Sequence, residues 1–250
     1  MGLFDEQIKQ IRGFVDELSG EGRLRTLGRR EVPWPRAYSL VLQEDTGLEL
    51  GNPSGASLSI LAWGEPSEIS EGRVSLVGPD VAEAGGGSIP FGQVVLVGGE
   101  FDNEYDSFRD IRDAVYDTHL DGFSVRTLPS RQTVWCRVST EARDGGFSLA
   151  DLGAALIEEL KTVEPVSCAE VLFVTSGRDD VERLAEPARG AQRVIEAMMK
   201  MYQEANFDCE TCEYKEVCDS VMDLKKIRDR LAGTIPPSPS RGEGRGGGEE

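Results

Sequence analysis

The chain opens on a run of apolar positions with helical spacing. Between residues 3 and 18 apolar side chains recur every three or four positions, and polar residues such as Glu6 and Lys9 fall between them. This pattern predicts an amphipathic helix. Its apolar positions are Leu3, Phe4, Ile8, Ile11, Phe14, Val15 and Leu18. Such a face packs on a domain core or binds a partner, and we assign residues 1–34 to this helix and a linker.

From about residue 35 to residue 98 the pattern changes to short apolar runs separated by glycine and proline. Runs of this kind are typical of β-strands. We predict strands at 38–42, 56–63, 74–77 and 94–97. The glycine-rich stretch 84–88 lacks the Lys-Ser/Thr ending of a phosphate-binding loop, so we expect an ordinary loop there.

Helical spacing returns at 103–120, 130–143 and 148–163. In the last of these, Ser148 and Asp151 stand at the spacing of a capping box. A strongly apolar strand follows at 168–175, and a long helix then runs to about residue 205. This order of elements predicts an α+β domain over residues 35–205, with helices packed on one mixed or antiparallel sheet.

Composition and charge narrow the range of partners. The sequence holds 27 Lys and Arg against 45 Asp and Glu, a net charge of −18, so it offers no broad basic surface for a phosphate backbone. We therefore expect no nucleic acid and no membrane partner. The first residues do not fit a signal peptide, and no apolar run reaches the roughly 20 residues of a membrane span, which predicts a cytoplasmic protein. Residues 232–250 are rich in Pro, Gly and Ser and are expected to be disordered.

Three of the five cysteines form a cluster. Cys209, Cys212 and Cys218 lie in residues 206–231, which we expect to form a cysteine-rich helical module. In a reducing compartment, clustered cysteines bind metal more often than they form disulfides. Thiolates suit an iron–sulfur cluster or zinc, and a thiol redox pair is the third alternative. The spacing resembles the three-cysteine element of cluster-bearing exonucleases, which favours a [4Fe–4S] cluster.

A four-iron cluster needs a fourth ligand from elsewhere in the chain or from outside it. Cys168 is the first choice because it begins a predicted core strand whose end could approach the motif, and Cys136 is the second. Either cysteine could equally well be a small buried apolar side chain without a metal-binding role. Zinc would need a further Cys or His, and the only histidine, His119, lies far upstream on a predicted helix.

A series of stretches in the middle of the chain resembles the beta subunit of carbon monoxide dehydrogenase/acetyl-CoA synthase, the CO-methylating acetyl-CoA synthase of anaerobic one-carbon metabolism. In chain order they are Leu48–Gly51, Glu71–Asp80, Ile89–Gly92, Val94–Val97, Val134–Ser139, Phe147–Leu156 and Glu170–Thr175. The resemblance spans roughly residues 45–220. It implies a shortened and divergent member of that family.

The resemblance also carries expectations for the cofactor sites. Cys209, Cys212 and Cys218 fall where the family's cubane ligands begin, but the family's later Cys-Gly-Cys is missing, which argues against nickel. Trp135 matches a tryptophan that the family associates with CoA. The resemblance therefore implies a CoA-type ligand near Trp135, Arg131 and Arg137, with core packing as the alternative role of Trp135.

Two classes of function follow from these expectations. The first is an accessory or electron-transfer protein that carries a [4Fe–4S] cluster and docks on a protein partner in a multi-subunit anaerobic complex. The second is an enzyme of the CO-methylating acetyl-CoA synthase type, which transfers acyl or methyl groups to CoA at a metal cluster. A structural subunit stapled by zinc or by a cluster is the third alternative.

Overall fold

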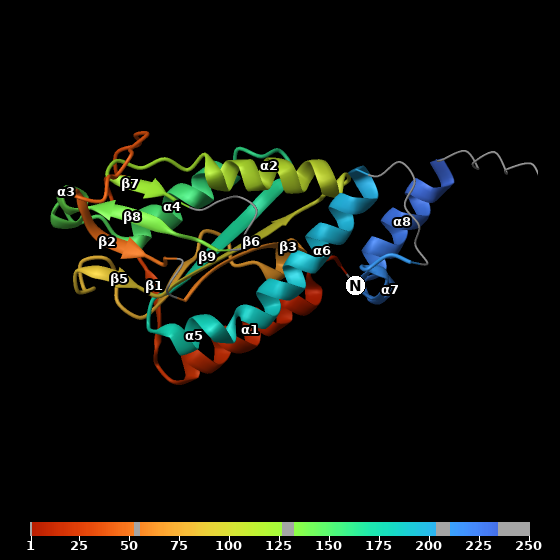
Figure 1. Cartoon of the computed structure of the whole chain (residues 1–250), viewed down its shortest axis with the longest axis horizontal. Coiled ribbons are helices and arrows are strands. Elements are labelled where there is room, and N and C mark those ends of the chain that lie inside the picture. The colour runs from red at the N-terminus through yellow and green to blue at the C-terminus, as the bar shows by residue number, and fades with distance from the viewer. Residues whose placement is uncertain (1, 53–55, 127–132, 204–210, 235–250) are drawn as a thin grey trace, which may run out of the picture.

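The computed structural model describes residues 2–52, 56–126, 133–203 and 211–234. Over these residues the chain has the predicted α+β fold, with helices packed on mixed β-sheets (Figure 1). The helices are α1 (Asp5–Gly20), α2 (Glu104–Tyr116), α3 (Thr140–Asp144), α4 (Leu149–Leu160), α5 (Arg178–Arg183), α6 (Ala185–Gln203), α7 (Lys215–Ser220) and α8 (Met222–Thr234), with a 3-10 turn η1 (Pro66–Glu68). The strands are β1 (Leu24–Leu27), β2 (Thr46–Leu50), β3 (Ser57–Gly64), β4 (Val74–Val77), β5 (Gly87–Ile89), β6 (Phe91–Gly99), β7 (Phe123–Val125), β8 (Cys136–Ser139) and β9 (Val166–Val174).

The larger sheet has five strands in the order β1-β4-β9-β6-β3. β3 runs parallel to β6 and β4 runs parallel to β9, whereas the β6–β9 and β1–β4 pairs are antiparallel. Of the three interior strands, β4 is buried at every position, and β6 and β9 are buried at all but one position each. Strands buried on both faces read as near-continuous apolar runs, which is why β4, β6 and β9 are visible in the sequence.

A second sheet has four strands in the order β5-β2-β8-β7, so the expectation of a single sheet was wrong. Its strands are only three to five residues long and carry too little alternation to stand out. β5 overlaps the glycine-rich stretch that was predicted to be a loop. It pairs in parallel with β2, which a local pattern does not reveal.

Three local predictions also need correction. Residues 38–42 do not form a strand, because Val41 N bonds with the Ser124 hydroxyl rather than with a neighbouring backbone. In the described part of the helix predicted at 130–143, residues 136–139 form strand β8 and the short helix α3 begins at Thr140. The long helix after residue 177 is divided into α5 and α6. The capping box of α4 is confirmed, since Ser148 and Asp151 each accept a hydrogen bond from the other's backbone N–H.

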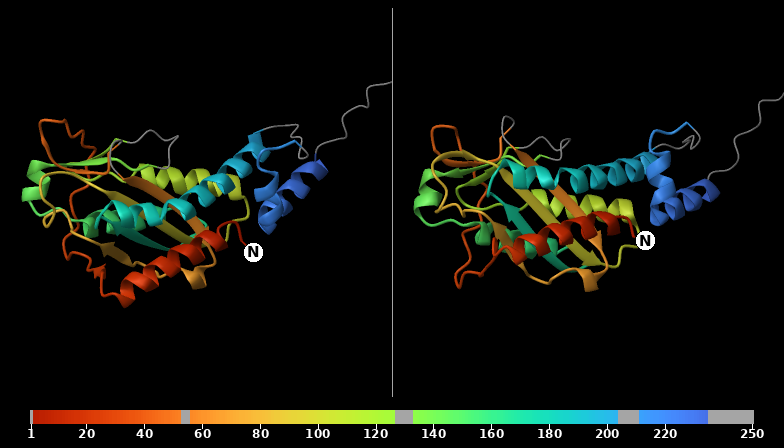
Figure 2. Two further views of the ribbon diagram at one scale, coloured as in Figure 1. Left: turned by 60° about the horizontal axis from the view of Figure 1, so that its bottom comes forward. Right: turned by 90° about the horizontal axis from the view of Figure 1, so that it is seen from below.

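Helix α1 packs on the core, so its apolar face serves domain packing rather than the binding of a partner. Ile8, Ile11, Phe14 and Leu18 are buried. The Phe4 ring meets Trp63 of β3 edge-on, with the ring centroids 4.5 Å apart. In Figure 2, α1 lies alongside α6 over the sheet.

A buried carboxylate beneath α1 ties this helix to the sheet. Glu170 of β9 is 6% exposed and forms an ion pair with Arg12 of α1. Its Oε2 lies 3.4 Å from Nη2 of Arg73 and accepts a hydrogen bond of 3.1 Å from the backbone N–H of Ser70. A buried charge is tolerated only with such partners.

Helices α2 and α4 cover the opposite face of the larger sheet. α4 packs closely on β4 at Gly153. A Cβ added at this position would lie only 2.5 Å from a Val74 methyl carbon. The next residue, Ser75, points the other way and lies in a small pocket with Ile11 and Arg12 of α1. α6 contacts β3, the edge strand, so that α2 and α6 flank the sheet where β3 pairs with β6.

The C-terminal helices α7 and α8 stand at one end of the molecule, beyond the sheets (Figures 1 and 2). Both contact α6. They occupy the region where a helical cysteine module was predicted. Across the described ranges, no helix has the length and apolar character needed to cross a bilayer.

One surface ion pair gives a pH-dependent prediction. The Arg25 guanidinium and the Asp80 backbone N–H bond with Glu83 and lower its pKa from an ordinary 4.5 to about 2. A carboxyl with a depressed folded pKa stabilises the fold above its unfolded pKa, and loses that contribution as the pH falls through the folded value. We therefore expect the stability difference between wild type and Glu83→Gln to shrink between pH 5 and pH 2.

Urea unfolding across this pH range measures the difference. Glu31→Gln changes an exposed carboxylate for which the described residues include no ion-pair partner, and serves as the control. A Glu83→Gln difference that stays constant with pH would contradict the assignment.

Candidate functional site

The cysteine module brings two of the predicted ligands to one place. Cys212 lies in the turn before α7 and Cys218 lies within α7. Both line a small pocket against α6, and hydrogen bonds from Lys215 N to Cys212 O and from Cys218 N to Tyr214 O hold the turn between them. Cys218 is 6% exposed, whereas Cys212 is half-buried.

The other polar side chains lining this pocket are mainly cationic. Lys200, Lys215 and Arg228 line it together with Tyr214, and no carboxylate is among the described residues of its wall. Carboxylates stand just outside, where Glu213 lies 3.6 Å from Lys200 and Asp219 lies 2.9 Å from Arg228.

The donor set therefore fits an anionic, thiolate-bound group. Soft thiolates suit iron and zinc, and the surrounding cations offset the negative charge of thiolates bound to a metal. The pocket itself measures about 20 Å³. A pocket of this volume has room for a single ion, and a four-iron cluster would require the side chains around it to separate.

The remaining predicted ligands are not brought to this pocket. Cys209 lies outside the described residues, and within those residues no group of three Cys, His, Asp or Glu side chains is placed to hold a metal ion. Cys168 lies on β9, where its Sγ is 3.7 Å from Pro66 O, and it is not part of the pocket wall. Its role as the fourth ligand stays a prediction.

Cys136, the second choice, lies elsewhere. It is 1% exposed on β8, and burial raises the pKa of its thiol, which keeps it protonated. A protonated thiol is a poor metal ligand. Cys136 instead contributes to the wall of a large cavity between the helices and the sheet.

Two of the three predicted CoA-contacting residues, Trp135 and Arg137, lie in and next to β8. Arg137 is 8% exposed, its Nε lies 3.0 Å from Glu49 Oε1, and its guanidinium lies 5.4 Å from the centre of the Trp135 ring. Its charge is thus already used within the protein. Arg131 lies outside the described residues, so contact of this trio with a ligand stays a prediction.

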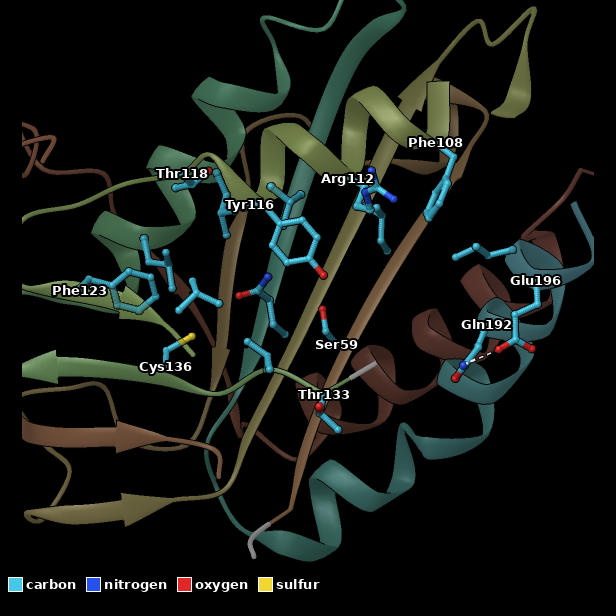
Figure 3. A pocket seen from close by; sticks show the side chains of 18 of the residues that line it. Ser59, Phe108, Arg112, Tyr116, Thr118, Phe123, Thr133, Cys136, Gln192 and Glu196 are labelled. Atoms are coloured by element: carbon cyan, nitrogen blue, oxygen red, sulfur yellow. Dashed lines mark hydrogen bonds between the residues drawn. The ribbon is translucent and has the colours of Figure 1, made fainter. Parts of the chain in front are cut away.

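The large cavity was not foreseen from the sequence. It has a volume of about 270 Å³ and lies between α2, α6 and the β3–β6 part of the sheet (Figure 3). Arg112 and Tyr116 reach it from α2, Gln192 and Glu196 from α6, and Ser59 from β3. The spacing of the helical residues marks one face of each helix, but only the tertiary structure shows that the two faces meet.

The central part of the fold matches a known protein family. The model of the CO dehydrogenase/acetyl-CoA synthase complex beta subunit matches residues 39–179, more than half of the chain. The chain belongs to this family, as the resemblance predicted. The matched residues include both sheets from β2 onward, as well as α2, α3 and α4. They end before the cysteine module.

Individual relatives carry a consistent name. The acetyl-CoA decarbonylase/synthase complex subunit beta of Methanothermobacter thermautotrophicus is 32% identical over 146 residues, which are 57% of this chain and 30% of the relative. That of Methanopyrus kandleri is 31% identical over 149 residues, 58% of this chain and 31% of the relative. Subunit beta 1 of Methanosarcina thermophila is 26% identical over 180 residues, which are 69% of this chain and 38% of the relative. The chain thus spans about a third of the length of these relatives.

Proposed function

We propose that this chain is an iron–sulfur protein that works within an acetyl-CoA synthase-type complex, with a [4Fe–4S] cluster held by Cys209, Cys212 and Cys218. One observation carries the proposal: Cys212 and Cys218 face a common pocket whose polar lining is mainly cationic. Bound there, such a cluster would supply one-electron transfer. Lys215 would offset part of its negative charge, whereas Lys200 and Arg228 are also paired with Glu213 and Asp219.

The assignment to a complex is supported by the relatives, which are named as subunits of the acetyl-CoA decarbonylase/synthase complex. We infer a protein partner from the same assembly and a place in anaerobic acetyl-CoA metabolism. A CoA-type ligand near Trp135 and Arg137 belongs to the same proposal.

A second candidate is favoured by the size of the pocket. A cavity of about 20 Å³ suits one ion better than a cubane, so zinc held by the same cysteines would stabilise the fold of the turn before α7. The two candidates differ in colour, magnetism and sulfide content.

The identity of the fourth ligand tests the first candidate further. We expect the reduced protein, purified without oxygen, to give a cluster signal in electron paramagnetic resonance that changes its g-values in Cys168→Ser. Cys136→Ser is the matched control, since it alters a buried cysteine in the other sheet. If the Cys168→Ser spectrum matches that of wild type, Cys168 is not a ligand. If wild type shows zinc and no sulfide, the cluster proposal fails.

A further inference from the structure

The large cavity between α2 and α6 combines an apolar wall with a few polar groups at its centre. Most of its lining is apolar, with Leu61, Val115, Phe123, Leu156, Ile195 and Met199 among the residues. At about 270 Å³ it exceeds the roughly 150 Å³ of an apolar cavity that holds benzene. Pockets of this kind are where proteins hold small molecules.

The polar groups at its centre are the unusual feature. Gln93 of β6 is 6% exposed and is paired in register with Ser59 of β3, so both side chains leave the sheet on the same side. Figure 3 shows the hydroxyls of Ser59 and Tyr116 directed toward the middle of the cavity. Among the described residues, no hydrogen bond reaches the Gln93 amide or either hydroxyl.

The Gln93 amide lines the cavity without a protein partner among the described residues, so a ligand in the cavity can satisfy it. The Gln93 amide offers both a donor and an acceptor, and the hydroxyls offer the same. Burial raises the pKa of Tyr116, which keeps its hydroxyl neutral and able to donate. These three groups form an uncharged hydrogen-bonding centre at the bottom of an apolar cavity.

The charged groups of the wall are already engaged. Arg112 donates from Nε and Nη2 to Asp113, and its guanidinium lies 5.7 Å from the centre of the Phe108 ring. Glu196 accepts a hydrogen bond of 2.6 Å from Gln192. The Arg112 charge is offset by Asp113, and both carboxylate oxygens of Glu196 already accept hydrogen bonds, so the head group that matches the Gln93, Ser59 and Tyr116 centre is polar and uncharged.

We propose that the cavity binds an uncharged amphipathic small molecule. Its apolar body packs between α2 and α6, and its amide, carbonyl or hydroxyl head bonds with Gln93, Ser59 and Tyr116. The site is separate from the cysteine pocket, since no described residue lines both.

Three probes of one shape test the chemistry of the head group. Biphenyl-4-carboxamide, biphenyl-4-carboxylate and biphenyl share an apolar body and differ in carrying a neutral head, a charged head or none. We expect the carboxamide to bind the full chain saturably in ligand-observed NMR. It should bind about tenfold more tightly than biphenyl, as one to two net hydrogen bonds imply, and more tightly than the carboxylate.

Two variants test whether the probe binds in the cavity. Gln93→Leu keeps the side-chain size and should lower carboxamide affinity about tenfold while leaving biphenyl nearly unchanged. Tyr116→Phe removes one hydroxyl without changing the packing and should lower carboxamide affinity by a smaller factor. Gln10→Leu makes the same substitution on the surface of α1 and should change neither affinity.

Other outcomes overturn the proposal. Equal affinities for all three probes would mean that the polar centre plays no part, and tightest binding of the carboxylate would mean an anion site at Arg112. Saturable binding that Gln93→Leu and Tyr116→Phe leave intact would place the probe elsewhere. Absence of saturable binding by every probe would mean a cavity filled by water only.

Discussion

We expect Glu170→Gln to lower the free energy of unfolding by about 3 kcal/mol, since removal of one partner from a buried ion pair leaves the other charges uncompensated. Glu170 is the carboxylate between Arg12 of α1 and Arg73, and it also accepts the Ser70 N–H. The value stays at the low end of the range for buried pairs because Arg12 and Arg73 are themselves 25% and 37% exposed.

Chemical denaturation of wild type and variant measures this loss. Glu182→Gln is the matched control, because its partner Arg178 is 60% exposed and such surface pairs contribute under 1 kcal/mol. A loss at Glu170 no larger than the loss at Glu182 would show that Glu170 does not anchor α1 to the sheet.

The second large effect concerns the cysteines. We expect Cys212→Ser and Cys218→Ser each to reduce the bound metal to background, because each removes one thiolate from the same pocket. Metal binding contributes to folding at such sites, so the protection of α7 and α8 amides in hydrogen exchange should fall as well. The α4 and β9 amides should keep their protection.

Cys136→Ser is the control, since this buried thiol lies in the wall of the large cavity rather than in the cysteine pocket. It should retain full metal content. Metal retained by both Cys212→Ser and Cys218→Ser would place the metal site outside the module.

The parts of the fold that could be predicted are those with a strong local signal. The apolar stripe of α1, the capping pair Ser148 and Asp151, and the continuous apolar run of β9 each specify their element without help from the rest of the chain. The second sheet could not be found this way. Its short strands are stabilised by pairing between distant segments, such as β2 with β8.

The same distinction applies to the sites. The spacing of Cys212 and Cys218 is local, so the sequence alone indicates a shared pocket. The cationic lining depends on Lys200 and Arg228, which are brought in by α6 and α8. The cavity around Gln93 depends on several segments that are far apart in the chain, and the sequence shows Gln93 only as a polar residue within an apolar strand.

The most direct test is metal and sulfide analysis of the full chain purified without oxygen. The proposed cluster predicts four irons and four sulfides per chain, with neither nickel nor zinc in stoichiometric amount. One zinc per chain without sulfide would mean that the cysteines hold a zinc ion instead of the cluster. A protein without any of these metals, even after reconstitution with iron and sulfide, would contradict the metal site altogether.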